Sequence, residues 1–147
     1  MEEKYRIIKF NNKNLEIDVK ISPFEKTIWL SIDQIALLFE RDKSVISRHI
    51  KNIFEINELD EISCVAFFAT ELNKYDPRTG KMRKTKIDVK LFNLDVIISV
   101  GYRVNSIMGV TFRKWANEVL KEYLIKGYAI NEERSLVTNE NYVRLIN

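Results

Sequence analysis

The sequence has one cysteine, Cys64, and one histidine, His49, among its 147 residues. A single cysteine excludes an internal disulfide and agrees with a reducing compartment such as the cytoplasm. A lone histidine and a lone cysteine do not supply the four ligands of a typical zinc site. The sequence also has neither a glycine-rich phosphate loop ahead of a lysine nor a nucleophile elbow. We therefore expect no enzyme activity, no metal and no cofactor.

Long apolar runs are also missing. No stretch reaches the roughly 20 apolar residues that a membrane-spanning helix needs. The N-terminal sequence MEEKYRIIKF does not have the charge order of a signal peptide. Apolar residues make up 46% of the chain and charged residues 31%, which is ordinary for a soluble globular protein. We therefore expect a soluble, cytoplasmic protein with no membrane partner.

Two short amphipathic helices joined by a polar turn are predicted between residues 29 and 54. Ser31 followed by Gln34 is a capping box, which marks Ser31 as the start of the first helix. The apolar pattern breaks at Glu40, and Asp42 is expected to cap the second helix with its carboxylate. The second helix has an apolar row that is expected to be buried. This row consists of Ile46, Ile50, Ile53 and Phe54.

The opposite row of the second helix is short, hydroxylated and mostly basic. Its members are Ser44, Ser47, Arg48, Lys51 and Glu55, with Lys43 and Asn52 beside them. This is the layout of a helix-turn-helix, whose second helix enters the DNA major groove. Arg48 is the best candidate for a bidentate contact to guanine. The same layout also fits a pair of scaffold helices whose polar face is simply solvated.

A long β-hairpin is predicted from about residue 63 to residue 91. Ser63 to Thr70 has strand composition, and Thr85 to Phe92 alternates strictly between polar and apolar residues. Between them, Asp76-Pro77-Arg78-Thr79-Gly80 is a strong turn signal. The tip is basic, because residues 73–86 contain six Lys or Arg against one Asp. A hairpin that follows a helix-turn-helix is the geometry of a wing. The wing residues expected to contact phosphates are Arg78, Lys81, Arg83, Lys84 and Lys86.

The rest of the chain predicts strands at residues 5–10, 15–21 and 27–30, and a helix over residues 94–104 that Asn93 caps. Gly101 in that helix indicates either a helix end or the close approach of another element. A last amphipathic helix is expected to start near Phe112 and to end at the C-cap Gly127. Asn131 is a candidate start of a new helix, and residues 135–147 are predicted to form a tail or the start of a further helix. We therefore predict one α+β domain over residues 1–134. It is a winged helix-turn-helix-like domain with N-terminal strands, a long β-hairpin and a C-terminal amphipathic helix.

Three segments resemble the bacterial RhuM family of virulence and DNA-binding proteins. They are ISRHIKNIFEINELDE (46–61), FNLDVIISVGYRVNS (92–106) and FRKWANEVLKEYLIKGYAINEER (112–134). TIWLSIDQIALLF is more loosely similar, and the last segment also resembles the Bro-type domains of phage antirepressors. Family members often have Gly where this chain has Glu40, so a distorted turn is expected here. Members usually continue well past residue 147, so the chain is expected to be an N-terminal fragment or a short member.

The resemblance implies a DNA-binding role, and our leading hypothesis is a regulator that binds duplex DNA. Since helix-turn-helix domains commonly read two half-sites, we also expect a homodimer. The alternative is a protein-interaction module of a virulence or toxin–antitoxin system, in which the helix pair is only scaffold. The first hypothesis needs Arg48, Lys51 and the basic hairpin on one continuous positive face.

Overall fold

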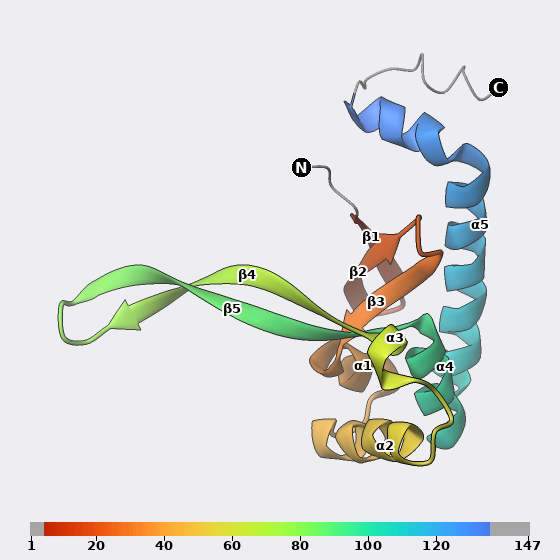
Figure 1. The fold of residues 1–147 in the computed structure, drawn as a ribbon, viewed down its shortest axis with the longest axis horizontal. Helices are drawn as coiled ribbons and strands as arrows, with labels where there is room; N and C mark the ends of the chain where they lie inside the picture. The colour runs from red at the N-terminus through yellow and green to blue at the C-terminus, as the bar shows by residue number, and fades with distance from the viewer. Residues whose placement is uncertain (1–4, 136–147) are drawn as a thin grey trace.

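The computed structural model describes residues 5–135 of the chain, with side chains through Glu122. The fold is α+β, with a five-stranded antiparallel sheet in the order β1-β2-β3-β5-β4. The strands are β1 (Arg6–Asn12), β2 (Leu15–Ser22), β3 (Thr27–Ser31), β4 (Val65–Asp76) and β5 (Lys81–Asn93). The helices are α1 (Ile32–Phe39), α2 (Lys43–Glu55), α3 (Glu61–Cys64), α4 (Leu94–Arg103) and α5 (Ile107–Ser135). The hairpin β4–β5 projects from the body, and α5 runs along the opposite side (Figure 1).

The three predicted N-terminal strands are confirmed, each with its end extended by one or two residues. The alternation in β2 buries Ile17, Val19 and Ile21, as a strand with one face against a core requires. The β3 strand pairs with β5 over only three residues, from Ser31 opposite Leu91 to Trp29 opposite Asn93. This short ladder joins the N-terminal strands to the base of the hairpin.

Three predicted boundaries near the hairpin and the C-terminus were wrong. The strand predicted from Ser63 starts at Val65, because Asp60 caps the short helix α3 by accepting a hydrogen bond from the Ser63 backbone N–H. The last helix, predicted to start near Phe112, begins at Ile107. Gly127 does not end that helix, and no new helix begins at Asn131, since α5 continues to Ser135. A glycine costs a helix only about 1 kcal/mol, which the residues on either side outweigh here. The predicted tail, residues 136–147, lies outside the described residues.

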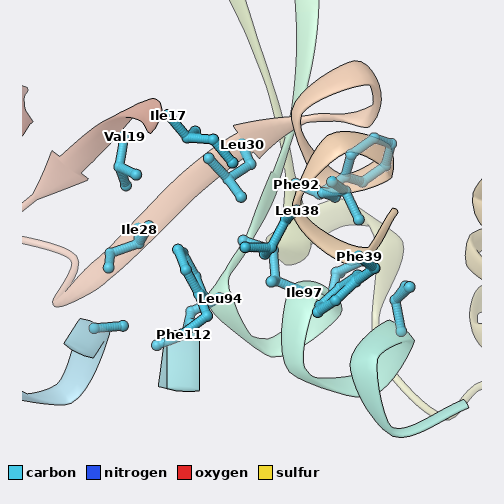
Figure 2. Packing of buried hydrophobic residues seen from close by; sticks show 14 of the residues in the cluster. Ile17, Val19, Ile28, Leu30, Leu38, Phe39, Phe92, Leu94, Ile97 and Phe112 are labelled. Atoms are coloured by element: carbon cyan, nitrogen blue, oxygen red, sulfur yellow. The ribbon is translucent and has the colours of Figure 1, made fainter. Parts of the chain in front are cut away.

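The main core lies between the sheet and the helices (Figure 2). Val19, Ile28 and Leu30 of the sheet meet Leu38 of α1 and Ile97 of α4, and all five are fully or almost fully buried. Removing apolar surface from water is the dominant stabilising term of such a core.

The α5 helix is anchored by an aromatic cluster at its first buried turns. The Phe112 ring lies edge-on to Phe10 of β1 at a centroid distance of 5.1 Å, and Trp115 lies 5.1 Å from Phe10 and 5.5 Å from Phe112. Phe112 is almost fully buried, whereas Trp115 is only half-buried. The predicted apolar stripe of this helix is therefore core over the described side chains, with Phe112 as its most enclosed member.

Two glycines form the crossing of α4 and α5. A Cβ atom added to Gly101 would lie 3.3 Å from the Gly109 Cα and 3.0 Å from the ring of Phe39. The sequence indicated either a helix end at Gly101 or the close approach of another element. The second interpretation is therefore confirmed. The crossing also brings Phe39 of α1 into contact with both helices, so the helix pair is packed directly on the C-terminal half of the chain.

Trp29 of β3 is buried, with 5% of its surface exposed. Its indole Nε1 has no hydrogen-bond partner among the described residues. The expectation that a buried indole N–H finds a partner is therefore not met within that part of the chain.

Candidate nucleic-acid interface

The turn between α1 and α2 is a Schellman motif. The Arg41 N–H donates to the Ala36 carbonyl at 3.1 Å and the Glu40 N–H donates to the Leu37 carbonyl at 3.3 Å, the pair of bonds that defines this helix end. Glu40 is in the left-handed conformation, with φ of 53°. The expected distortion of the turn is therefore wrong, because glutamate adopts the conformation that glycine would favour. At the other end of α1, the capping box between Ser31 and Gln34 is confirmed by both of its hydrogen bonds.

Arg41 fixes this turn to the rest of the molecule. Its guanidinium donates to the Phe39 carbonyl at 3.0 Å and to the Val104 carbonyl at 2.9 Å. These carbonyls are at the C-terminal ends of α1 and α4, where the partial negative charge of a helix favours a cation. One side chain thus joins the helix pair to α4, and the orientation of α2 is set by the body of the domain.

Replacing Glu40 by glycine is expected to raise the free energy of unfolding by about 1 kcal/mol. A left-handed conformation costs an L-residue about 1–2 kcal/mol, and glycine avoids this cost at the price of greater freedom in the unfolded chain. Chemical denaturation would measure the change. Glu40→Ala is the matched control, since it removes the same charge and keeps the Cβ atom. Equal stabilisation by both variants would show that charge, and not backbone strain, is responsible.

The predicted faces of α2 are confirmed. Ile46, Ile50 and Ile53 are buried, and Phe54 is half-buried. The outer row is exposed along its whole length, and we call it the α2 row. The α2 row consists of Ser44, Ser47, Arg48 and Lys51. It offers two hydroxyls and two cations to solvent on a rigid helix.

The first turn of α2 differs in part from the prediction. Asp42 occupies the N-cap position, but its side chain makes no capping hydrogen bond, so its predicted capping bond is wrong. Lys43 forms an exposed ion pair with Asp33 of α1, with 3.2 Å between Nζ and Oδ1. Lys43 is therefore already paired with a carboxylate, and an exposed pair of this kind is weak enough for another anion to compete with it.

Asn52 lies on the side of α2 that faces α4. Its Oδ1 accepts a hydrogen bond from Arg103 at 2.8 Å, and the same guanidinium donates to Glu58 at 2.8 Å. The Glu58 carboxylate also accepts a 2.6 Å hydrogen bond from the Ser99 hydroxyl. The Ser99 hydroxyl and then the Arg103 guanidinium hold the pKa of Glu58 below its usual value. This network holds the end of α2 against α4, which no sequence pattern indicated.

His49 is half-buried beside this network. Burial, followed by the nearby charges of Arg103 and Arg48, lowers the pKa of its imidazole. A lowered pKa favours the neutral ring at neutral pH. His49 thus does not add to the positive charge of the α2 row at that pH.

The hairpin has the predicted length, but its two strands continue to Asp76 and from Lys81, close to the turn, and its cations lie mostly on β5. Beyond its pairing with β3, the hairpin continues as a two-stranded ribbon over residues 67–90, which we call the arm (Figure 1). Near the base of the arm, the Phe68 ring lies 4.3 Å from the Tyr5 ring. The predicted turn is confirmed: the Gly80 N–H donates to the Asp76 carbonyl at 2.8 Å, and Gly80 has φ of 72°. Of the predicted phosphate-contacting residues, Arg78 alone lies in the turn. The others, all exposed, follow along β5: Lys81, Arg83, Lys84 and Lys86.

Cations of the arm are divided between its two faces, because side chains of a strand alternate. Lys84 and Lys86 share one face with Lys90, whereas Lys81 and Arg83 lie on the other. The predicted group of tip cations is therefore not a single patch. Lys90 was not among the predicted residues, although the alternation of β5 placed it on the same face as Lys86.

A groove of about 360 Å³ lies between α2 and the base of the arm. Ser47 and Lys51 of the α2 row line one side of it, and Lys90 of β5 lines another. Its apolar lining includes Phe54 and Phe92, while Glu61 of α3 is the one carboxylate among its lining residues. The α2 row is thus adjacent to the face of the arm that carries Lys84, Lys86 and Lys90. The two predicted elements of the interface meet at this groove.

A comparison with protein families gives a match to the C-terminal half of the chain. The model described as the virulence protein RhuM family matches residues 69–144. The chain belongs to the RhuM family. The match covers nearly all of the arm, the whole of β5, α4 and α5, and so includes two of the three segments on which the resemblance was based. The RhuM segment at residues 46–61, within and after α2, lies outside the match. Searches of curated proteins and of solved structures gave no match.

Two further features of this RhuM chain bear on its site. No helix in residues 5–135 combines the length and apolar character needed to cross a membrane. Within the same described part of the chain, no group of three or more His, Cys, Asp or Glu side chains is arranged to hold a metal ion.

Proposed function

We propose that this RhuM family protein binds duplex DNA as a regulator, with α2 as the recognition helix and the arm as a wing. The observation that carries the proposal is the groove at which Ser47 and Lys51 of α2 meet Lys90 of β5. A helix that reads bases and a basic ribbon that contacts phosphates must lie side by side to act on one duplex. This adjacency supports the winged helix-turn-helix hypothesis only in part, because the cations of the arm are divided between two faces and do not form one continuous positive face with the α2 row.

The roles of the residues follow from their chemistry. Arg48 carries a planar guanidinium that suits the O6 and N7 atoms of guanine, and Ser44 and Ser47 can contact bases or phosphates. Lys51 and Lys90 border the groove and are placed for the backbone between the two elements. Asn52 has no reading role in this proposal, because its side-chain oxygen is bonded to Arg103. Binding as a homodimer to two half-sites remains part of the proposal.

An interaction with a protein is the second candidate, and the surface of the arm favours it. Phe67, Tyr75 and Met82 are each 60% or more exposed, although they are large and apolar. Aromatic residues and methionine are enriched in protein–protein interfaces. A module of a virulence or toxin–antitoxin system would use this surface and leave the α2 row solvated.

Selection of binding sites from random duplexes separates the two candidates and supplies the site for a sharper test. On the selected site, Arg48→Ala is expected to weaken binding by about 1–3 kcal/mol and to relax the preference at one base pair. Titrations with selected and scrambled duplexes would measure both effects. Arg48 is exposed, so the variant should fold normally.

Lys9→Ala is the matched control for Arg48→Ala. Lys9 is an exposed cation on β1, the edge strand farthest from β4, and it pairs with Asp18. Its loss should leave the selected-to-scrambled affinity ratio unchanged. If Arg48→Ala also left that ratio unchanged, α2 would not be the recognition helix. Absence of duplex affinity at low salt would favour the protein-interaction candidate.

A further inference from the structure

The arm carries a pair of like charges that nothing in the described structure neutralises. Lys74 of β4 is directly opposite Arg83 of β5 in the ladder. Residues directly opposite each other in an antiparallel pair share a face, with Cβ atoms about 4.5–5.5 Å apart, and like charges in these positions are destabilising. Among the described residues, neither cation makes an ion pair with a carboxylate, and both are exposed. The free protein therefore holds two cations together at a cost.

The carboxylates nearest in register do not relieve this pair. Asp76 is on the same face, but it accepts a hydrogen bond from the Arg78 N–H at 3.0 Å and pairs with the Arg78 guanidinium at 3.5 Å. Glu71 is on the other face, where it lies 3.9 Å from Lys84. The Lys74–Arg83 pair thus points to an anion supplied from outside the chain.

The arm also places this pair far from the groove. Arg83 is eight residues along β5 from Leu91, the last residue that pairs with β3, so it lies about 26 Å out at about 3.3 Å per residue. One turn of duplex DNA is about 34–36 Å long. Arg83 therefore lies about three-quarters of a helical turn from the base of the arm. A contact to the backbone beside α2 would need only that base.

Both edges of the arm are unpaired beyond the sheet, and an isolated two-stranded ribbon is marginally stable in water. A ribbon with cations on both faces suits a position between two phosphate backbones better than a position on one of them. This distribution differs from that of a wing that rests on a single backbone.

We propose that the Lys74–Arg83 pair binds a backbone phosphate of the duplex about three-quarters of a helical turn from the α2 contact. The inference rests on the proposed function and extends it, since it assigns a second DNA contact to Lys74, which the sequence did not single out. The phosphodiester supplies the negative charge that the pair lacks. The affinity of the protein should then depend on the length of duplex beside the recognised site.

The test compares a short duplex, limited to the bases that α2 selects, with a duplex extended by one turn on each side. The wild-type protein should bind the long duplex more tightly and with a steeper salt dependence. Lys74→Gln/Arg83→Gln should lower the log–log salt slope on the long duplex by about 0.9, the value for the loss of one phosphate contact. Over a fourfold change in salt concentration this is about a 3.5-fold difference in affinity. On the short duplex the double variant should match the wild type.

A second readout distinguishes binding from a structural role. Without DNA, the double variant should melt at the same temperature as the wild type or higher, because a repulsive pair has been removed. Lys9→Gln/Lys13→Gln removes the same charge from the β1–β2 hairpin and should retain the gain from duplex extension.

Three results would overturn the proposal. The double variant could keep the full gain on the long duplex, it could lose affinity equally on both duplexes, or it could melt well below the wild type. If the wild type binds the short duplex but gains nothing from extension, the arm inference fails while the proposed function stands. If the wild type binds neither duplex, the proposed function fails and this inference fails with it.

Discussion

Replacing Phe112 by alanine is expected to lower the free energy of unfolding by about 3–5 kcal/mol. The Phe112 side chain is 1% exposed and lies edge-on to Phe10, with Trp115 on the next turn. Removing it leaves a cavity between β1 and α5 and also forfeits the ring contacts. Since α5 covers one side of the sheet, loss of this anchor should loosen the helix as well.

Thermal melting and denaturant titration would measure this loss. For a domain of this size, a change of 3–5 kcal/mol corresponds to a fall of roughly 6–20 °C in melting temperature. Arg113→Ala, at the next position and exposed, should change stability by no more than about 0.5 kcal/mol. A loss below about 1 kcal/mol for Phe112→Ala would mean that α5 is not held by this cluster.

Replacing Gly101 by alanine is expected to destabilise the protein, although alanine is the better helix former. The new Cβ atom would lie 3.0 Å and 3.2 Å from ring atoms of Phe39 and 3.3 Å from the Gly109 Cα. The Phe39 ring is almost completely buried, and the third neighbour is backbone, so neither can move aside freely. Overpacking of this kind costs about 1–3 kcal/mol, and the gain in helix propensity offsets about 1 kcal/mol of it.

Gly109→Ala is the control on the facing helix. Its added Cβ atom would have its nearest contacts at 3.4 Å and 3.6 Å, which are ordinary van der Waals distances. Stability should then be unchanged or rise by up to about 1 kcal/mol from helix propensity alone. Denaturant titration of the two variants gives opposite signs if packing at the crossing decides the outcome. A gain in stability in both variants would show that the crossing can adjust.

Features specified by nearby residues could be predicted from the sequence. The capping box at Ser31, the cap at Asn93 and the turn before Gly80 each depend on a few neighbouring side chains, and the structure confirms all three. The buried faces of α2 and β2 followed from their periods of 3.6 and 2 residues. The exposed α2 row is the complement of such a face, so its exposure was predictable too.

The errors arose where a local signal was weaker than its surroundings. Gly127 resembles a helix end, but α5 continues through it. The distal part of β4, through Glu71, Asn73 and Lys74, lacks strand alternation, and its structure comes from pairing with the regular pattern of β5. Strand pairing is a tertiary contact, so the length of the arm could not be inferred from β4 alone.

The candidate site depended even more on contacts between distant residues. Nothing in the sequence places Lys90 beside Lys51 or directs Arg103 toward Asn52, which is 51 positions away. These neighbours follow from the packing of α2 on α4 and from the angle at which the hairpin leaves the sheet. The sequence therefore indicated which residues could contact DNA. Their positions relative to one another could be known only from the folded structure.

The arm is built so that its reach can change independently of the core. Its two strands pair with each other residue by residue. Among the described residues, no other element covers the distal half of the arm (Figure 1). Inserting two residues into each strand beside the turn would move the turn outward by about 6.8 Å and keep every side chain on its original face. That increment equals about two base pairs of a duplex at about 3.4 Å each. The length of such a hairpin can therefore change by insertions or deletions in its distal part, and the packing of the core stays the same.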